Sequence, residues 1–240
     1  MKMTWKLCRF CLDLIYPNCC PCCGDFIVWN EFLCSECAGK VRIDTDSLCR
    51  KCGKTKEDCM CTGKLMYDEA AAISYYEAES KTGLLAMKAS NSRNFGHYAG
   101  MEIGRWIKEQ PEWMNCDGIV SVPMSRKKKL LRGYNQADII AKGISESTGI
   151  PLIKDCIIKK HSRHEQHTLR ARERAENVYS IIPAGRDLEG MRLIICDDII
   201  TTGSTMNRCA EILKDCGAEK VYAAAAAVTR RKREEQDGSN

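Results

Sequence analysis

The run from Arg192 to Thr205, which reads R-L-I-I-C-D-D-I-I-T-T-G-S-T, places the tightest constraint on the fold of this chain. It opens with the apolar stretch Leu193 to Ile195, which is typical of a parallel strand buried on both faces. A helical pattern starts near Met206 and ends at Gly217, a residue suited to a C-cap. A strand, a polar turn and a helix in this order predict an open α/β sheet. Such sheets bind ligands at the carboxyl ends of their strands.

The side chains of this turn suit a ribose 5-phosphate. Gly203 permits a positive φ and a close approach of the backbone to a ligand. Amides at the start of a helix form an anion site, and hydroxyl groups add donors for phosphate oxygens. The adjacent carboxylates Asp197 and Asp198 suit the vicinal hydroxyls of a ribose, or a magnesium ion held partly through water. The turn hydroxyls belong to Thr201, Thr202, Ser204 and Thr205.

This run resembles the signature of the type I phosphoribosyltransferases, which bind 5-phosphoribosyl 1-diphosphate (PRPP). The resemblance implies that Asp197 and Asp198 hold the ribose hydroxyls and serve catalysis, and that the turn holds the 5-phosphate. The implied PRPP-binding residues are Asp197, Asp198, Thr201, Thr202, Gly203, Ser204 and Thr205. A generic strand-loop-helix with a solvated acidic end is the alternative, and the complete pattern disfavours it.

The distribution of cysteine predicts a zinc-binding module. Of the 17 cysteines, twelve precede residue 62. In a reducing compartment, such clustered pairs indicate metal ligands rather than disulfides. Eight thiolates suit two tetrahedral structural zinc sites, which would supply stability that this part of the chain, with few large apolar side chains, lacks. The predicted ligands are Cys20, Cys23, Cys34, Cys37, Cys49, Cys52, Cys59 and Cys61.

Several details of this module stay open. Cys19 and Cys22 could replace Cys20 and Cys23 as the first pair of ligands. The four cysteine pairs, or knuckles, could share zinc ions in sequence order or in a cross-braced manner. The last pair has C-x-C spacing, so the second site is less regular. Residues 4–15 show an amphipathic helical pattern that would pack on the module. Cys8 and Cys11 in that stretch also have ligand spacing.

A second domain is expected to follow. We divide the chain into a helix and zinc-binding module (1–64), a phosphoribosyltransferase-like domain (65–229) and a charged, disordered tail (230–240). Strands are expected near 68–76, 118–123, 152–159 and 221–228, and helices near 83–88, 97–109 and 134–148.

Two basic segments interrupt this domain. The segment 124–136 is expected as a loop, with five cations from Arg126 to Arg132. Its place after a strand favours a diphosphate or nucleic-acid contact over a merely solvated face. The segment from His161 to Arg174 favours a cationic flap over a metal site formed by its histidines. Few aromatic residues accompany these cations, so a stacking platform for single-stranded DNA is thin.

In chain order the motifs resemble those of the ComF (competence protein F) family, with C-P-C-C-G at 20–24, V-P-M-S-R and R-G-Y-N-Q within 122–136, Q-x-x-L-x-x-x-x-R-x-x-N-V at 166–178, and D-D-I-I-T-T-G-S-T at 197–205. The resemblance implies a doubly wound, mainly parallel type I phosphoribosyltransferase sheet behind a small zinc module. It implies a diphosphate loop and a flexible catalytic loop, with candidate residues Ser125, Arg126, Arg132, Arg163 and Arg174. It also implies a role in DNA uptake during natural competence, alongside a helicase-like partner.

The remaining features bound this interpretation. Thr201 stands where transferases of 6-oxopurines carry an aspartate, so that acceptor class is disfavoured and the acceptor stays open. A formal charge of +5 fits anionic ligands without indicating nucleic acid. No apolar run approaches the ~18 residues of a membrane span, and no secretory leader is evident, so a cytoplasmic protein is expected. The alternative function is a non-catalytic scaffold that binds single-stranded DNA or a partner.

Overall fold

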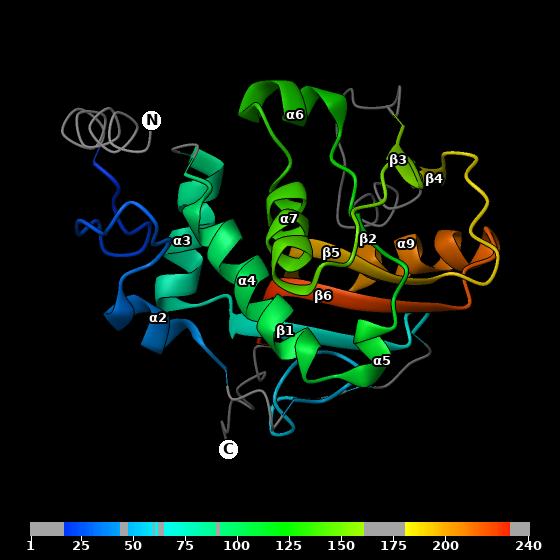
Figure 1. Ribbon diagram of the computed structural model, residues 1–240, viewed down its shortest axis with the longest axis horizontal. Helices are drawn as coiled ribbons and strands as arrows, with labels where there is room; N and C mark the ends of the chain where they lie inside the picture. The colour runs from blue at the N-terminus through cyan, green and yellow to red at the C-terminus, as the bar shows by residue number, and fades with distance from the viewer. Residues whose placement is uncertain are drawn as a thin grey trace, which may run out of the picture.

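The computed structural model describes residues 17–43, 48–59, 61, 65–89, 92–160 and 181–230 (Figure 1). Its strands are β1 (Glu69–Tyr75), β2 (Gly118–Ser121), β3 (Ile157–Lys159), β4 (Ile181–Pro183), β5 (Arg192–Ile200) and β6 (Lys220–Val228). Its helices are α2 (Ser35–Val41), α3 (Ala78–Ala89), α4 (Asn94–Lys108), α5 (Pro111–Met114), α6 (Arg126–Arg132), α7 (Gln136–Thr148) and α9 (Ser204–Asp215). The expected N-terminal helix with Cys8 and Cys11, the flap with Arg163 and Arg174, and the tail beyond Arg230 lie outside the described residues.

Four parallel strands form the main sheet, in the order β1-β6-β5-β2. β5 lies inside the sheet, with Cys196 opposite Ala224 of β6 on one side and Ser121 of β2 on the other. The alanine run of β6, Ala223–Ala227, is fully buried. Strands that are apolar along their whole length form where both faces of the sheet are covered. The expected parallel sheet is therefore confirmed.

Helices cover both faces of this sheet, as Figure 1 shows. On one face, Phe95 and Ile103 of α4 pack with Ile140 of α7 in a core that also includes α3. On the other face, Met206 and Leu213 of α9 pack against the sheet. The result is a three-layer α/β arrangement, with α3, α4 and α7 on one side and α9 on the other.

The direction of chain progression reverses between β2 and β5. β2 leads through α7 to Leu152, which forms a parallel bridge with Ile119 beyond the free edge of β2. β5 leads through α9 to β6 in the opposite direction. Such a reversal marks the ligand crevice of a doubly wound sheet. β3 and β4 form a separate antiparallel pair outside the main sheet.

The cysteine-rich segments cover the opposite edge of the sheet. The backbone N–H of Ile43 donates to the carbonyl of Ile73 in β1 at 2.8 Å, and the N–H of Ala70 donates to the carbonyl of Arg50 at 2.6 Å. An uncovered edge strand exposes unpaired backbone groups that can pair with other chains. The module therefore protects β1. The boundary at residue 65, between the module and β1, remains our proposal.

Several elements differ from the expectations, among them β3, which covers only Ile157–Lys159 of the strand expected near 152–159. The segment 124–136, expected as a loop, contains α6. The hydroxyl of Ser125 accepts the Lys128 N–H at 3.4 Å, and Gly133, at a φ of 76°, ends the helix. The capping residues and the helix-favouring Lys, Arg and Leu between them account for the difference. α3 begins earlier than expected, and β5 continues to Ile200, so the acidic pair lies within the strand.

We predict that the crossing of α4 and α7 depends on glycine. A Cβ at Gly100 would lie 2.3 Å from the Ile140 carbonyl oxygen and 2.8 Å from the Cα of Gly143. Because backbone atoms cannot move aside cheaply, Gly100→Ala is expected to destabilise the fold by about 1–3 kcal/mol, measured by urea denaturation. Gly39→Ala, in helix α2 with open space around the site, is the matched control and should be neutral or slightly stabilising. Equal stability of the two variants would contradict the prediction.

Candidate functional site

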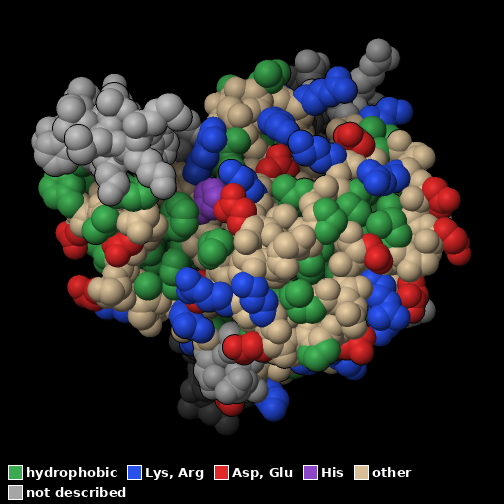
Figure 2. All heavy atoms as spheres, viewed as in Figure 1, with side chains coloured by type: hydrophobic (Ala, Val, Ile, Leu, Met, Phe, Trp, Pro, Cys, Tyr) green, Lys and Arg blue, Asp and Glu red, His purple; other side chains and the backbone are tan. Residues whose placement is uncertain are grey.

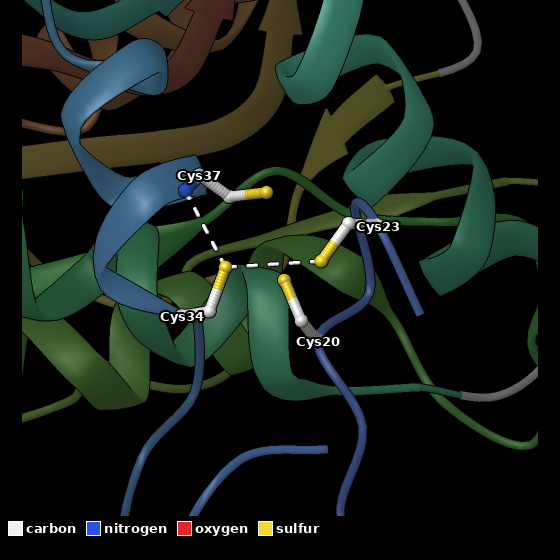
Figure 3. A group of neighbouring side chains, drawn as sticks. All are labelled: Cys20, Cys23, Cys34 and Cys37. Carbon is white, nitrogen blue, oxygen red and sulfur yellow. Dashed lines mark hydrogen bonds between the residues drawn. The ribbon is translucent and has the colours of Figure 1, made fainter. Parts of the chain in front are cut away.

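Two tetrads of cysteine form in the zinc module. The sulfur atoms of Cys20, Cys23, Cys34 and Cys37 all lie within 4.8 Å of one another, and so do those of Cys49, Cys52, Cys59 and Cys61. Figure 3 shows the first tetrad, with its sulfur atoms directed toward a common centre. The pairing is sequential, which answers the question that the sequence left open.

The spacing of the sulfur atoms fits zinc. A tetrahedral ion with Zn–S bonds of ~2.3 Å places its sulfurs about 3.8 Å apart. The Cys23 and Cys34 sulfurs lie 3.7 Å apart, and those of Cys49 and Cys61 lie 3.9 Å apart. Four thiolates complete the coordination shell and leave no position for a substrate, so the zinc is structural.

The same backbone turn builds half of each tetrad. The N–H of Gly24 donates to the Cys20 carbonyl at 2.9 Å, and the N–H of Gly53 donates to the Cys49 carbonyl at 2.9 Å. Both glycines have a positive φ, of 86° and 70°. Glycine adopts this conformation without steric cost, which explains why it follows the second cysteine of each pair.

The sulfur positions favour the pair Cys20 and Cys23 over the alternative pair Cys19 and Cys22. Cys20 and Cys23 lie in the tetrad with Cys34 and Cys37, and the sulfurs of Cys19 and Cys22 belong to neither tetrad.

The acidic pair lies in the carboxyl-terminal half of β5. The N–H of Asp198 donates to Oδ1 of Asp197 at 2.8 Å. Oδ2 of Asp198 lies 3.0 Å from Nζ of Lys88, near the end of α3. Lys88 is a site residue that the sequence analysis missed. Its position at the end of the helix that follows β1 is the only sequence signal, and the pairing with β5 depends on the tertiary fold.

The environment of Asp197 disfavours its charge. Burial raises the pKa of its carboxyl group well above the ordinary value, and the adjacent Asp198 raises it further. The ammonium group of Lys88 acts in the opposite direction. A carboxylate in this position would be stabilised by a cation or by hydroxyl donors from a ligand.

The hydroxyl-rich turn follows directly at the carboxyl edge of the sheet. Gly203 has a φ of 77° and is the N-cap of α9. The hydroxyls of Thr202 and Ser204 lie 2.5 Å apart, and both side chains are exposed. The helix amino terminus and these hydroxyls face solvent at the switch point between β2 and β5. This arrangement can bind an anion.

The opposite wall of the crevice follows β2. Arg126 and Arg132 lie on α6, a helix with no buried residue, whose Leu130 and Leu131 are 85% and 78% exposed. Figure 2 shows Lys and Arg side chains gathered around this helix. Arg132 donates to the side-chain oxygen of Gln136 at 3.1 Å. Carboxylates and hydroxyls therefore follow β5, and long cationic side chains follow the neighbouring strand β2.

A cavity of about 440 Å³ lies beside β2. Ser121, Lys129 and Asp138 contribute to its lining, and Ser121 donates to Asp138 at 2.5 Å. Neither the acidic pair of β5 nor the turn 201–205 lines this cavity. The cavity and the anion site are separate features of the same region.

Comparisons with known proteins find a matching family for each of the two parts of the chain. Residues 131–239 match the phosphoribosyl transferase domain family, and residues 11–70 match the double zinc ribbon domain family. Competence protein F of Haemophilus influenzae is 24% identical over 80% of this chain and 94% of its own length. Competence protein ComFC of Streptococcus pneumoniae is 24% identical over 80% of this chain and 86% of its own length.

Other relatives match a shorter part of the chain. DNA utilization protein YhgH of Escherichia coli is 31% identical over 44% of this chain, and the match spans 46% of that protein. Among solved structures, a purine phosphoribosyltransferase from Pyrococcus horikoshii has 22% identity and a TM-score of 0.35, over 54% of this chain and 70% of that protein. The two family matches and the parallel sheet assign a type I phosphoribosyltransferase fold preceded by a double zinc ribbon.

We predict two zinc ions per chain, with ligands that can be removed selectively. Cys20→Ser/Cys23→Ser should retain one zinc, because a tetrad with two ligands left binds the ion weakly. The matched control Cys19→Ser/Cys22→Ser should retain both, because these sulfurs lie outside the tetrads. Zinc content is measured by elemental analysis after dialysis. Loss of one zinc from the control variant would contradict the assignment.

We also predict that Asp197 lowers the stability of the fold at neutral pH. The folded carboxyl group holds its proton more tightly than the unfolded one. The free energy of unfolding therefore falls as the pH rises from the ordinary aspartate pKa toward the raised pKa of Asp197. Asn has no proton to lose, so Asp197→Asn should be more stable than the wild type at neutral pH by about 0.5–2 kcal/mol.

Chemical denaturation at several pH values measures this difference. The free energies of unfolding of the two proteins should converge near about pH 3, where Asp197 is protonated in both the folded and the unfolded protein. Asp187→Asn, at an exposed aspartate, is the matched control and should follow the wild type at every pH. A variant at Asp197 that is less stable than wild type at neutral pH would contradict the assignment of a raised pKa.

Proposed function

We propose that this chain, which belongs to the competence protein F family, binds PRPP with magnesium at the carboxyl edge of its sheet. The observation that carries the proposal is the juxtaposition of Asp197 and Asp198 with the turn from Thr201 to Thr205 at the switch point. A phosphoribosyl group carries both vicinal hydroxyls and a 5-phosphate. The carboxylates match the hydroxyls, and the turn matches the phosphate.

In this proposal each part of the crevice has its own role. Asp197 and Asp198 accept hydrogen bonds from the ribose hydroxyls. The hydroxyls of Thr201, Thr202, Ser204 and Thr205 and the amides around Gly203 bind the 5-phosphate. Ribose hydroxyls would replace Lys88 as the partner of Asp198, which frees the ammonium group for the diphosphate.

Cations on the other wall would bind the leaving group. Ser125 and Arg126 stand at the start of α6 and Arg132 at its end, beside the crevice. Arg163 and Arg174, in the segment outside the described residues, are proposed to approach the diphosphate from the flap. Carboxylate oxygens are suitable ligands for magnesium, which would neutralise the charge of the diphosphate when bound.

As an enzyme, the chain would transfer the phosphoribosyl group to an acceptor. Loss of diphosphate leaves positive charge on the ribose ring, and Asp197 and Asp198 are placed to stabilise it as they hold the hydroxyls. Catalysis would then rest on positioning and charge stabilisation, without a protein nucleophile. The acceptor stays open, with 6-oxopurines disfavoured because Thr201 offers no basic carboxylate.

The names of the relatives support a cellular role. They refer to competence and DNA utilization, so we propose a role for this chain in DNA uptake. A helicase-like partner is proposed from the family resemblance alone. Free cysteines in the described residues fit a reducing cytoplasm. None of the described helices is long and apolar enough to cross a membrane. A second candidate, a scaffold for single-stranded DNA, is favoured by the exposed cations of α6.

Calorimetric titration with PRPP and magnesium tests the proposal. Zinc-replete wild-type protein should bind PRPP, and Asp197→Asn/Asp198→Asn should lose at least about a hundredfold in affinity, because two charged hydrogen-bond acceptors are removed. The control Asp187→Asn/Asp215→Asn removes the same amount of charge at exposed positions that precede strands β5 and β6 in the chain. This variant should bind PRPP like wild type. Absence of binding to folded wild type would overturn the proposal and make single-stranded DNA the next ligand to titrate.

A further inference from the structure

Tyr67, six residues after the last predicted ligand Cys61, is buried against the proposed 5-phosphate turn. It is 4% exposed, and its hydroxyl lies 3.4 Å from the position that a Cβ on Gly203 would take. Burial raises the pKa of Tyr67 to about 12, and the sulfurs of Cys52, Cys61 and Cys49 contribute to this shift. The phenol hydroxyl therefore lies at the turn, within electrostatic range of the second tetrad.

A backbone connection reinforces this contact. The N–H of Met66, five residues after the last ligand Cys61, donates to Oδ1 of Asn207 at 2.6 Å. The N–H of Asn207 donates in turn to the carbonyl of Gly203 at 2.8 Å. The segment that leaves the tetrad is thus tied to the first turn of α9, and that turn is tied to the glycine of the anion site.

A third connection joins the same two regions from the end of β6. Arg230 lies 3.3 Å from Oδ2 of Asp58, between the ligands of the second tetrad, and 4.2 Å above the ring of Tyr75. The preceding residue, Thr229, donates its N–H to the carbonyl of Ile200 at 3.1 Å and its hydroxyl to the carbonyl of Thr201 at 3.4 Å. Thr229 therefore contacts the start of the turn, and its neighbour Arg230 contacts the segment that carries the second tetrad.

The first tetrad has different neighbours among the described residues. Its segment packs on α4, where Asn94 donates to Asn18 at 2.7 Å and Tyr98 donates to the Ala38 carbonyl at 3.3 Å. Phe32 stacks on His97 with ring centroids 4.9 Å apart. These contacts hold the first ribbon against α4, so its tetrad serves as the control for a general effect of zinc.

We propose that zinc at the tetrad Cys49, Cys52, Cys59 and Cys61 positions the ribose 5-phosphate site through Tyr67. The inference rests on the proposed function for the identity of the ligand. Small zinc modules lose their structure without the metal, and a binding turn must be held closely to its productive geometry. Zinc loss at this tetrad would release Tyr67 and the turn, and would thereby disable phosphoribosyl binding while the sheet remains folded.

Hydrogen exchange tests the coupling without any ligand. Amide exchange of residues 201–206, followed by mass spectrometry, should be at least about tenfold faster in Cys59→Ser/Cys61→Ser than in wild type. The matched variant Cys34→Ser/Cys37→Ser, which breaks the first tetrad, should exchange in this segment like wild type. Equal protection of the turn in all three proteins would overturn the inference, and so would equal acceleration in both variants.

A substitution that keeps both tetrads intact provides the second test. Tyr67→Leu removes the ring beside Gly203, and Tyr98→Leu removes a tyrosine that contacts the first ribbon. With zinc content verified, Tyr67→Leu should bind ribose 5-phosphate about tenfold more weakly and bind inorganic diphosphate as wild type does, because only the 5-phosphate turn is displaced. Tyr98→Leu should bind both like wild type.

Titration with the two compounds distinguishes failure of the positioning role of Tyr67 from failure of the proposed function. Equal loss of ribose 5-phosphate and diphosphate affinity in Tyr67→Leu, or unchanged affinity for both, would overturn the positioning role. If wild type binds neither compound, the proposed function fails, and the hydrogen-exchange comparison still decides whether the second tetrad controls the turn.

Discussion

The pairing of β5 between β2 and β6 is the constraint on which the rest of the structure depends. Its backbone hydrogen bonds are satisfied on both sides, so the strand can pass through the core and still present Asp197 and Asp198 at its end. The same pairing sets the reversal of chain direction between β2 and β5. The crevice at that point and the turn that follows are consequences of one buried strand.

This position of the acidic pair costs stability. A carboxylate within a covered sheet loses hydration, and a second carboxylate beside it adds repulsion, so the pKa of Asp197 is raised. Lys88 offsets part of this cost from α3, at 3.0 Å from Asp198. The apolar residues of the strand, Leu193 to Cys196, are fully buried and supply the packing that keeps the strand in place. Strand stability and the proposed ligand binding thus come from different halves of β5.

Local patterns were sufficient to predict a large part of this arrangement. The apolar run of β5, the hydroxyl-rich turn and the paired cysteines each carry their information within a few residues. The sheet, the turn and the cysteines that gather in the two tetrads could therefore be located from the sequence. Segment 124–136 shows the limit of that approach. Its charges suggested a loop, whereas the caps Ser125 and Gly133 define a helix that projects into solvent.

Residues whose role depends on distant contacts could not be identified in this way. Lys88 meets Asp198 across 110 positions of sequence, and Tyr67 meets Gly203 across 136. Neither has a local pattern that distinguishes it from an ordinary surface lysine or a core tyrosine. The sequential pairing of the knuckles is likewise a property of the folded module, since either pairing satisfies the same spacing.

The zinc module and the sheet are therefore one physical unit at the site. The second ribbon covers the free edge of β1 through backbone hydrogen bonds, and edge coverage alone would explain its presence. The contacts of Tyr67 and Arg230 go further, because they reach the carboxyl edge, where a structural cap has no need to extend. A module that only protected an edge strand would tolerate movement relative to the turn. Arg230 joins Asp58 of this module to Thr229, which contacts the turn at Ile200 and Thr201, so we infer that the geometry of the anion site depends on the integrity of the second tetrad.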